Sequence, residues 1–203
     1  DVGGSIRAPA THCGVVGLKA THGRVPLTGH WPEVLLRAMH VGPMARSVRD
    51  IALAMDVIAG PDGICQYAVP VPSKWLPDSE TLTSGLRIGW YVGSGFGPVD
   101  RQVAGTVAGA AAALEEAGCI VDEVPLPALE RRDTQAISAA VYGAEAGHYL
   151  QPLVSGREAD LSPNIQRRLA APVPSLDEYL DAREGWEEVR REMAGYFARY
   201  DLL

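Results

Sequence analysis

The opening 26 residues, DVGGSIRAPATHCGVVGLKATHGRVP, constrain the backbone of this chain most strongly, because two adjacent glycines precede a serine there. Further glycines follow at positions 14, 17 and 23. Glycine adopts positive φ without strain and lets other backbone or a ligand approach closely. We therefore predict turns and short extended pieces from residue 1 to residue 29.

Ser5 follows the glycine pair and is a candidate nucleophile. A glycine turn can point successive backbone N–H groups at one place, and acyl transfer needs such donors for its oxyanion; the loss of one commonly costs ~10²–10³ in rate. The candidate donors are the N–H groups of Val2, Gly3, Gly4 and Ser5. A structural turn serine is the alternative, since such turns are common. The chain lacks the nucleophile elbow G-x-S-x-G, because Arg7 stands where its last glycine would be.

A nucleophilic serine also needs a base, and no side chain close to Ser5 in sequence is an evident one. His12 and His22 are available, but we expect both at surface or turn positions. Lys19 could act in a Ser-Lys pair, yet a single lysine after Gly-Leu is expected to be solvated. The residues alone therefore support an α/β domain with a candidate nucleophilic serine.

Charge and cysteine content exclude several classes of function. The net charge is −7, with 18 basic and 25 acidic residues, and no basic patch interleaved with aromatics indicates a nucleic-acid surface. Three dispersed cysteines indicate a reduced, intracellular protein, and we expect Cys13 to be a small buried residue. No metal-binding pattern occurs among the histidines. No apolar run reaches the ~20 residues of a membrane span, so we expect a cytoplasmic protein without cofactor or metal.

The remaining sequence alternates predicted helices and strands. Ser47 caps a helix over about 48–59, and Ser175, with Glu178 in a capping box, begins a long helix that ends near residue 200. Strand, helix and strand follow one another through LRIGWYVG, DRQVAGTVAGAAAALEEAG and CIVDEVPLP, which predicts a parallel βαβ unit. ISAAVYGAEAGHYL is predicted helical, and RYDLL a helix end turning into a strand. The predicted organisation is a single domain with four parts: core 1–63, surface connection 64–85, strand-helix-strand unit 86–126, and variable helical region 127–203.

Residues 1–63 resemble the amidase signature family. DVGGSIRAPATHCGVVGLKATHGRVP is similar to the core motif of that family, and GPMARSVRDIALAMDVIAGPD to its second recognisable block, in the same order and at suitable spacing. Ala20 departs from the pattern, which usually has proline after Gly-Leu-Lys. The resemblance covers about a third of the chain and implies an α/β/α sandwich around a mixed sheet.

The resemblance also implies a mechanism, which is hydrolysis or transfer of an amide through a serine acyl-enzyme. It makes Ser5 the nucleophile and places the oxyanion hole at the N–H groups of Val2, Gly3, Gly4 and Ser5. The family's proton relay, a lysine and a serine with a cis peptide bond, lies upstream of this motif and matches no residue here. Lys19 is not the position of the catalytic lysine. Asp1 and Arg7 are expected to pair or to hold the loop.

Three functions stay open. The first is an amide hydrolase with a small-molecule amide substrate and no nucleic-acid or membrane partner; a homodimer is compatible with it. The second is one component of the tRNA-dependent amidotransferase, which would require a tight partner protein; TGHWPEVLLRAMHVGP argues against it, because that type carries small, serine-rich residues there. The third is a non-catalytic family member or fragment with only a binding or scaffolding role. Both ends of the chain fall within motifs or predicted elements, so we expect an internal fragment, partial in fold and inactive by itself.

Overall fold

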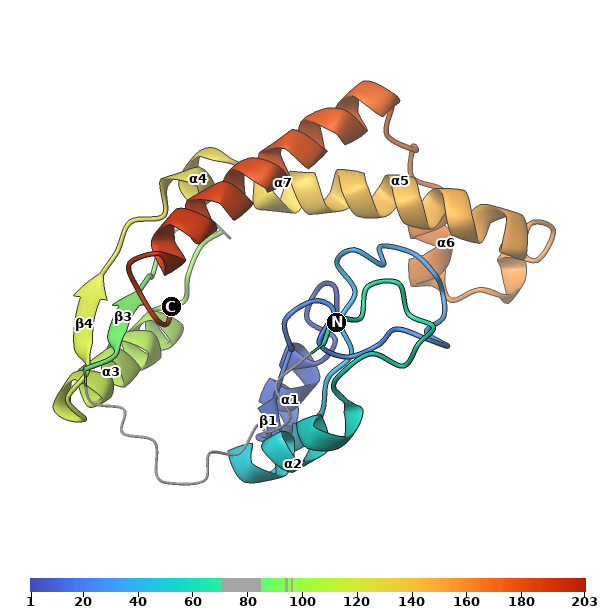
Figure 1. The fold of residues 1–203 in the computed structure, drawn as a ribbon. Coiled ribbons are helices and arrows are strands. Elements are labelled where there is room, and N and C mark those ends of the chain that lie inside the picture. The colour runs from blue at the N-terminus through green and yellow to red at the C-terminus, as the bar shows by residue number, and fades with distance from the viewer. Residues whose placement is uncertain (71–84, 94, 96) are drawn as a thin grey trace. The chain divides into compact units, whose positions relative to one another are not determined.

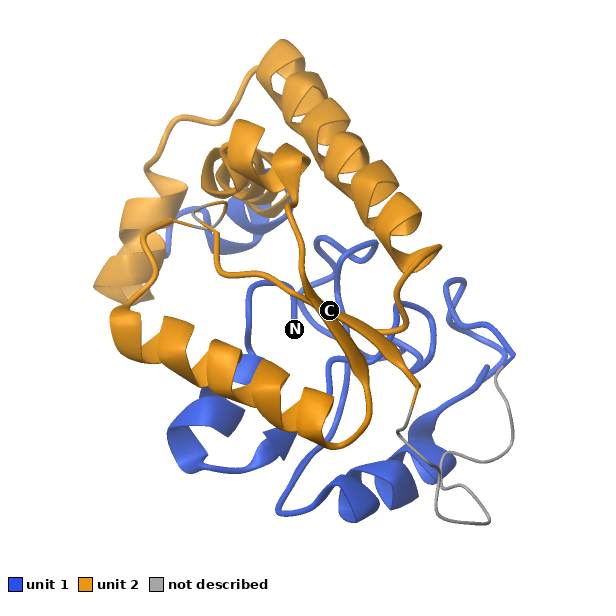
Figure 2. Cartoon of the chain, turned by 90° about the vertical axis from the view of Figure 1, so that its left-hand side faces the viewer, with its two compact units in different colours: residues 1–80, 148–157 blue, residues 81–147, 158–203 orange. Residues whose placement is uncertain are grey.

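The computed structural model describes residues 1–70, 85–93, 95 and 97–203, and it divides into two compact units (Figure 2). Unit 1 comprises residues 1–80 and 148–157, and unit 2 comprises residues 81–147 and 158–203. Positions 71–84 of the predicted surface connection lie outside the described residues. Both units combine helix with strand pairs, which confirms the α/β class.

Short regular elements joined by long turns make up the N-terminal part of unit 1. Strands β1 (Val16–Gly17) and β2 (Met44–Ala45) pair antiparallel, and helix α2 (Val48–Ile58) packs beside them. A small apolar core of Ala20, Val25, Ile51 and Met55 lies among these segments. The elements are α1 (Arg7–Cys13), β1 (Val16–Gly17), β2 (Met44–Ala45) and α2 (Val48–Ile58) (Figure 1).

Helix α1 corrects the prediction of turns and extended pieces for residues 1–29. It begins directly after the glycine-serine turn and ends at Gly14, whose φ of 63° is left-handed. No side chain next to the helix caps its first turn. Instead, the carboxylate of Asp1 accepts the N–H groups of Ile6 and Arg7, at 3.0 and 3.3 Å. An acceptor five or six residues away has no local signature, so sequence reasoning missed the helix.

Helix α2 confirms the prediction made for residues 48–59. The Ser47 side chain accepts from the backbone N–H of Asp50 at 3.1 Å and caps the helix. Ile51 and Met55 point into the core of unit 1, as their helical spacing requires. Val48, Leu53 and Val57 remain exposed.

Unit 2 contains the predicted parallel βαβ arrangement (Figure 1). Strand β3 (Arg87–Trp90) pairs parallel with β4 (Ile120–Glu123), and Arg87 lies opposite Ile120. Helix α3 (Arg101–Glu116) connects the strands and packs against both. Its N-terminus is capped by Asp100, whose carboxylate accepts from Gln102 N at 2.7 Å.

Two of the remaining helices were predicted, one through ISAAVYGAEAGHYL and the long helix α7 (Leu176–Phe197), whereas the short helices α4 (Pro127–Arg131) and α6 (Pro163–Leu169) were not predicted individually. The long helix α7 begins after Ser175 with both bonds of the predicted capping box, Glu178 N to Ser175 Oγ at 3.2 Å and Ser175 N to Glu178 Oε2 at 2.7 Å. The helices are α4 (Pro127–Arg131), α5 (Thr134–Val154), α6 (Pro163–Leu169) and α7 (Leu176–Phe197), with a 3₁₀ turn at Glu158–Asp160.

The last residues return to the sheet of unit 2, as predicted for RYDLL. Leu202 forms a parallel bridge with Ile88 of β3. Its carbonyl oxygen accepts from Gly89 N at 3.1 Å and from the Tyr196 hydroxyl at 2.7 Å. Tyr196 also belongs to the unit 2 core with Val124, Leu126 and Leu129. These contacts connect the C-terminal end of the last helix to strand β3.

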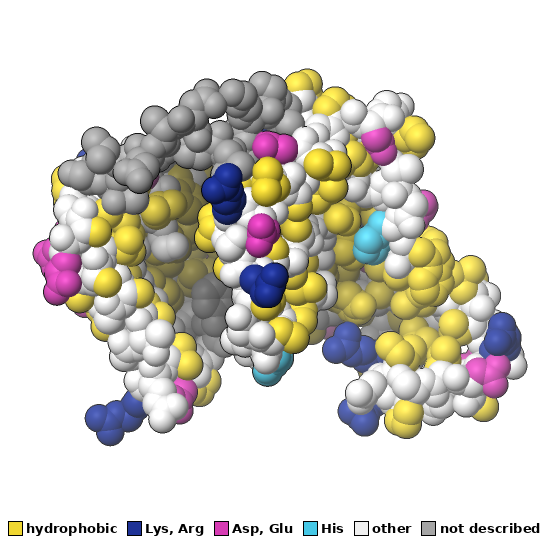
Figure 3. Space-filling model, turned by 90° about the horizontal axis from the view of Figure 1, so that it is seen from below, with side chains coloured by type: hydrophobic (Ala, Val, Ile, Leu, Met, Phe, Trp, Pro, Cys, Tyr) yellow, Lys and Arg dark blue, Asp and Glu magenta, His cyan; other side chains and the backbone are white. Residues whose placement is uncertain are grey.

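The exposed surface mixes apolar and charged side chains, and Figure 3 shows both kinds on the face seen from below. Scattered exposed apolar residues are normal in globular proteins. Among the residues with described positions, no helix combines the length and apolar character that crossing a membrane requires.

Candidate active site

Ser5 lies in an exposed turn between the glycine pair and helix α1. Gly4 has a φ of 118°, which side-chain-bearing residues rarely adopt, so this position of the turn requires glycine. Gly3 faces open space, since a β-carbon built on it would meet no atom within 4 Å. The turn therefore presents its serine at the surface, with room beside the first glycine.

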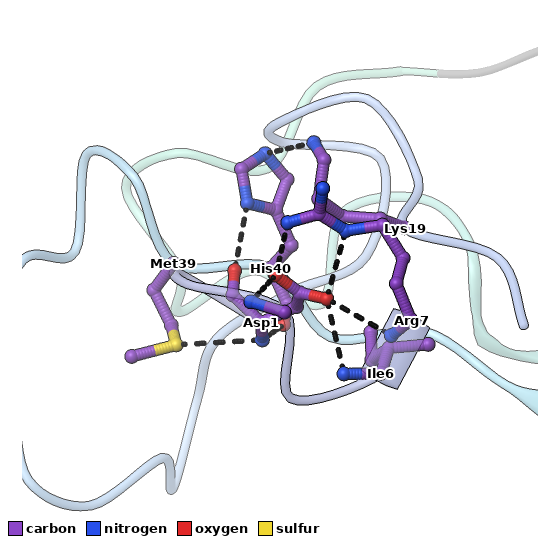
Figure 4. A network of polar contacts seen from close by, with 7 residues as sticks. Asp1, Ile6, Arg7, Lys19, Met39 and His40 are labelled. Atoms are coloured by element: carbon purple, nitrogen blue, oxygen red, sulfur yellow. Dashed lines mark hydrogen bonds and ion pairs between the residues drawn. The ribbon is translucent and has the colours of Figure 1, made fainter. Parts of the chain in front are cut away.

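The carboxylate of Asp1 holds this turn from inside (Figure 4). One oxygen accepts from Gly4 N at 2.9 Å, and the other accepts from Ile6 N at 3.0 Å. The guanidinium of Arg7 donates to both oxygens, at 2.9 and 3.2 Å. The Asp1 side chain is 0% exposed, whereas that of Arg7 is 55% exposed. The expected pairing of Asp1 with Arg7 is thus present, and it fixes both sides of Ser5.

Among the predicted oxyanion-hole donors, the N–H group of Gly4 is engaged by Asp1. The N–H groups of Val2, Gly3 and Ser5 donate to no acceptor within the part of the chain that the structure describes. Outside a helix or strand ladder, such groups are free to bind a ligand oxygen.

His40 and Lys19 lie beside Asp1, although neither was predicted to belong to the site (Figure 4). The backbone N–H of His40 donates to the Asp1 carbonyl oxygen at 3.0 Å, and ring atom Nδ1 lies 3.1 Å from the same oxygen. On the other side of the ring, Nε2 is 3.3 Å from Lys19 Nζ. The sequence carries no local signal for this contact, because 39 residues separate His40 from Asp1.

Burial and neighbouring charge act on both groups of this pair. Burial, followed by the positive charge of Lys19, lowers the pKa of His40 to about 4. The pKa of Lys19 is also lowered, first by burial and then by the charge of Arg7. The imidazole is therefore neutral at pH 7.

The other candidate bases have different surroundings. His12 is exposed, as expected. His22 lies in a turn, as expected, and is half-buried: its Nε2 lies 2.8 Å from the Leu36 carbonyl oxygen, and its ring contacts those of His40 and Tyr67 edge-on. Lys19 is likewise half-buried, so the expectation of a solvated lysine was wrong.

The cysteines correct one further expectation. Cys13, the last residue of α1, is exposed, and Cys119 is the buried one. Across residues 1–70, 85–93, 95 and 97–203, no group of three or more His, Cys, Asp or Glu side chains is placed to bind a metal ion.

An exposed serine in a glycine turn beside free backbone N–H groups, carried by an α/β chain, defines a candidate acyl-transfer site. A family profile described as Amidase matches residues 1–203. The chain belongs to the amidase signature family.

Relatives within this family include both amidases and amidotransferase components. The chain is 31% identical over 235 residues to a glutamyl-tRNA(Gln) amidotransferase subunit from Moorella thermoacetica, covering all of this chain and 46% of that protein. It is 38% identical over 124 residues to an acylamidase of Rhodococcus erythropolis, covering 61% of this chain and 26% of that protein. A solved 6-aminohexanoate cyclic dimer hydrolase is 26% identical with a TM-score of 0.74, covering 98% and 44%. The chain thus spans about half the length of both the cyclic dimer hydrolase and the Moorella protein.

Proposed function

We propose that the protein carrying this chain hydrolyses linear amides through a serine acyl-enzyme, with Ser5 as the nucleophile. The observation that carries the proposal is the exposed Ser5 in a turn that the buried Asp1 carboxylate holds, within a chain of the amidase signature family. We also propose the family's α/β/α sandwich around a mixed sheet, to which the strand pairs described above would contribute.

In the proposed reaction Ser5 Oγ bonds to the amide carbon, and the carbonyl oxygen becomes an oxyanion. The N–H groups of Val2, Gly3 and Ser5 are free to receive that oxygen, while the N–H of Gly4 keeps the turn attached to Asp1. The C–N bond then breaks, and the proton from Oγ goes to the leaving amine. Water next attacks the acyl-enzyme, which releases the acid and restores the serine hydroxyl.

The proton relay is the lysine and bridging serine that the family resemblance implies, and no residue of this chain matches them. A neutral lysine can serve as the base, since burial lowers the pKa of an ammonium group. The Lys19 side chain is engaged with His40, which supports a different role for it.

The test is Ser5→Ala in the full-length protein that carries this chain. We expect at least about a 10³-fold loss of aryl-amide hydrolysis and no labelling by a fluorophosphonate probe, because covalent catalysis needs its nucleophile. The melting temperature should stay unchanged, since the hydroxyl is exposed. Thr21→Ala, which removes another exposed hydroxyl in unit 1, is the matched control. Activity within about tenfold of the parent in Ser5→Ala would exclude the proposal.

A component of a tRNA-dependent amidotransferase is the second candidate, favoured by the match of the whole chain to the Moorella protein. It would use the same serine chemistry but depend on a partner. Steady hydrolysis of simple amides by the purified protein alone supports the hydrolase. Glutamine hydrolysis that appears only after a partner protein is added supports the amidotransferase. A homodimer stays a prediction for either candidate.

A further inference from the structure

Asp1 makes two sets of contacts, one with the glycine turn and Arg7 and the other with His40. The carboxylate of Asp1 faces the glycine turn, whereas its backbone carbonyl oxygen faces His40. That oxygen accepts the backbone N–H of His40 at 3.0 Å and has the His40 ring 3.1 Å away. The Asp1 nitrogen in turn donates to the His40 carbonyl oxygen. Any movement of His40 therefore reaches Asp1 and, through its carboxylate, the turn that carries Ser5.

The hydrogen-bond partners determine the tautomer of His40. A carbonyl oxygen can only accept, so Nδ1 must carry the proton in its contact with Asp1. A neutral imidazole then has a lone pair at Nε2, where the Lys19 ammonium can donate across 3.3 Å. Lys19 thereby selects the tautomer in which Nδ1–H donates to the Asp1 carbonyl oxygen.

We propose that His40 and Lys19 are positioning residues for the acylation of Ser5, with Lys19 fixing the His40 tautomer and His40 fixing Asp1. This inference rests on the proposed function, because it concerns the rate at which the same serine reacts. It assigns neither residue a contact with substrate and neither a proton transfer.

The groups that face His40 determine how the arrangement responds to acid. They are the Lys19 ammonium and the His22 ring, whose centroid is 5.5 Å from that of the His40 ring. Each disfavours a positive imidazole, as does burial. Protonation at Nε2 would set two donors against each other and break the contact with Lys19. The contact between Lys19 and His40 should therefore be lost as the pH falls through the His40 pKa of about 4, and at a higher pH in a Lys19→Met variant, while Nδ1–H still donates to Asp1.

The first experiment compares His40→Leu with His40→Asn in the full-length protein, by the rate of fluorophosphonate labelling at Ser5. Asparagine carries an N–H donor near the position of Nδ1, whereas leucine carries none. We expect about a tenfold slower rate with leucine, as for one lost hydrogen bond, and a rate within about threefold of the parent with asparagine. His30→Leu is the matched control, because Nδ1 of His30 lies 3.2 Å from the carbonyl oxygen of Pro32, two residues away, and not from the turn that carries Ser5. Equal rates for both His40 variants, or a parent-like rate with leucine, would overturn the proposal.

The second experiment follows the His40 ring by ¹⁵N NMR while the pH is lowered. We expect the Nδ1–H tautomer in the parent, with protonation near pH 4. In Lys19→Met the neutral ring should no longer be restricted to the Nδ1–H tautomer, and it should protonate at higher pH. Arg49→Met removes an exposed charge elsewhere in unit 1 and should change neither. An unchanged tautomer and pH profile in Lys19→Met would refute the role of Lys19.

These outcomes separate the two proposals. Labelling that survives Ser5→Ala would refute the proposed function. The NMR measurement of the His40 tautomer does not depend on Ser5, so it still tests the contact between Lys19 and His40. Labelling that requires Ser5 but ignores His40 and Lys19 would leave the function in place and remove the positioning role.

Discussion

The N-terminal turn of unit 1 and the capped helices of unit 2 are held by different kinds of contact. In unit 2, side chains cap helices that begin within three residues of them, as Asp100 and Ser175 do. In unit 1, the functional turn depends on the Asp1 carboxylate and on His40, which lies 39 residues further along the chain. A helix cap can be predicted from the neighbouring residues, whereas a hydrogen bond between residues far apart in the sequence cannot. The comparison indicates that the turn with Ser5 is more sensitive to single changes than the helices of unit 2.

The largest effect is expected from Asp1→Ala. It removes a fully buried acceptor and leaves the buried N–H of Ile6 without a partner, which should destabilise the protein by at least about 2 kcal/mol. Serine labelling should fall together with stability, because the turn loses its anchor. Urea unfolding and probe labelling measure the two losses.

Asp100→Ala in unit 2 is the matched control for Asp1→Ala. It removes an exposed helix cap and should cost about 1 kcal/mol without slowing the labelling. Equal losses of stability and labelling in the two variants would contradict the contrast between the units.

An intermediate effect is expected from Tyr196→Phe in unit 2. Its hydroxyl donates to the Leu202 carbonyl oxygen at 2.7 Å, so its loss should cost about 1 kcal/mol and lower the melting temperature. Tyr200→Phe, whose hydroxyl meets Asp122 at an exposed position, should change the melting temperature less. A reversed order would show that the contact with Leu202 does not hold α7 to the sheet.

The smallest effect concerns the pH dependence of the α7 capping box. Hydrogen bonds from the Ser175 backbone and side chain lower the pKa of Glu178 below its ordinary 4.5. A lowered folded-state pKa stabilises the protein above the unfolded-state value, and this contribution is lost as the pH falls through the folded value. Glu178→Gln should therefore be less stable than the parent at pH 7, with the difference vanishing at acidic pH. Thermal unfolding at several pH values measures it, and a constant difference would argue against the charged cap.

Much of the fold could be predicted because local signals coincide with each element. Ser47, Asp100 and Ser175 stand where helices begin, and the strand-helix-strand pattern gave the parallel pair β3–β4. The early helix α1 was missed because its N-terminal acceptor is Asp1, in the turn before it. For the candidate site, the motif indicated Ser5 and its glycines but gave no role to His40.

The sequence by itself determined the α/β class, the helix boundaries with local caps, and the glycine-serine turn with its family resemblance. Glycine and capping side chains act within a few residues, so their effects are visible in the order of residues. Only the tertiary structure decided that Asp1 is buried, that His40 and Lys19 gather around it, and that Cys13 is exposed. Those outcomes depend on which distant segments meet, since burial and hydrogen-bond pairing are properties of the folded arrangement and not of the neighbouring residues.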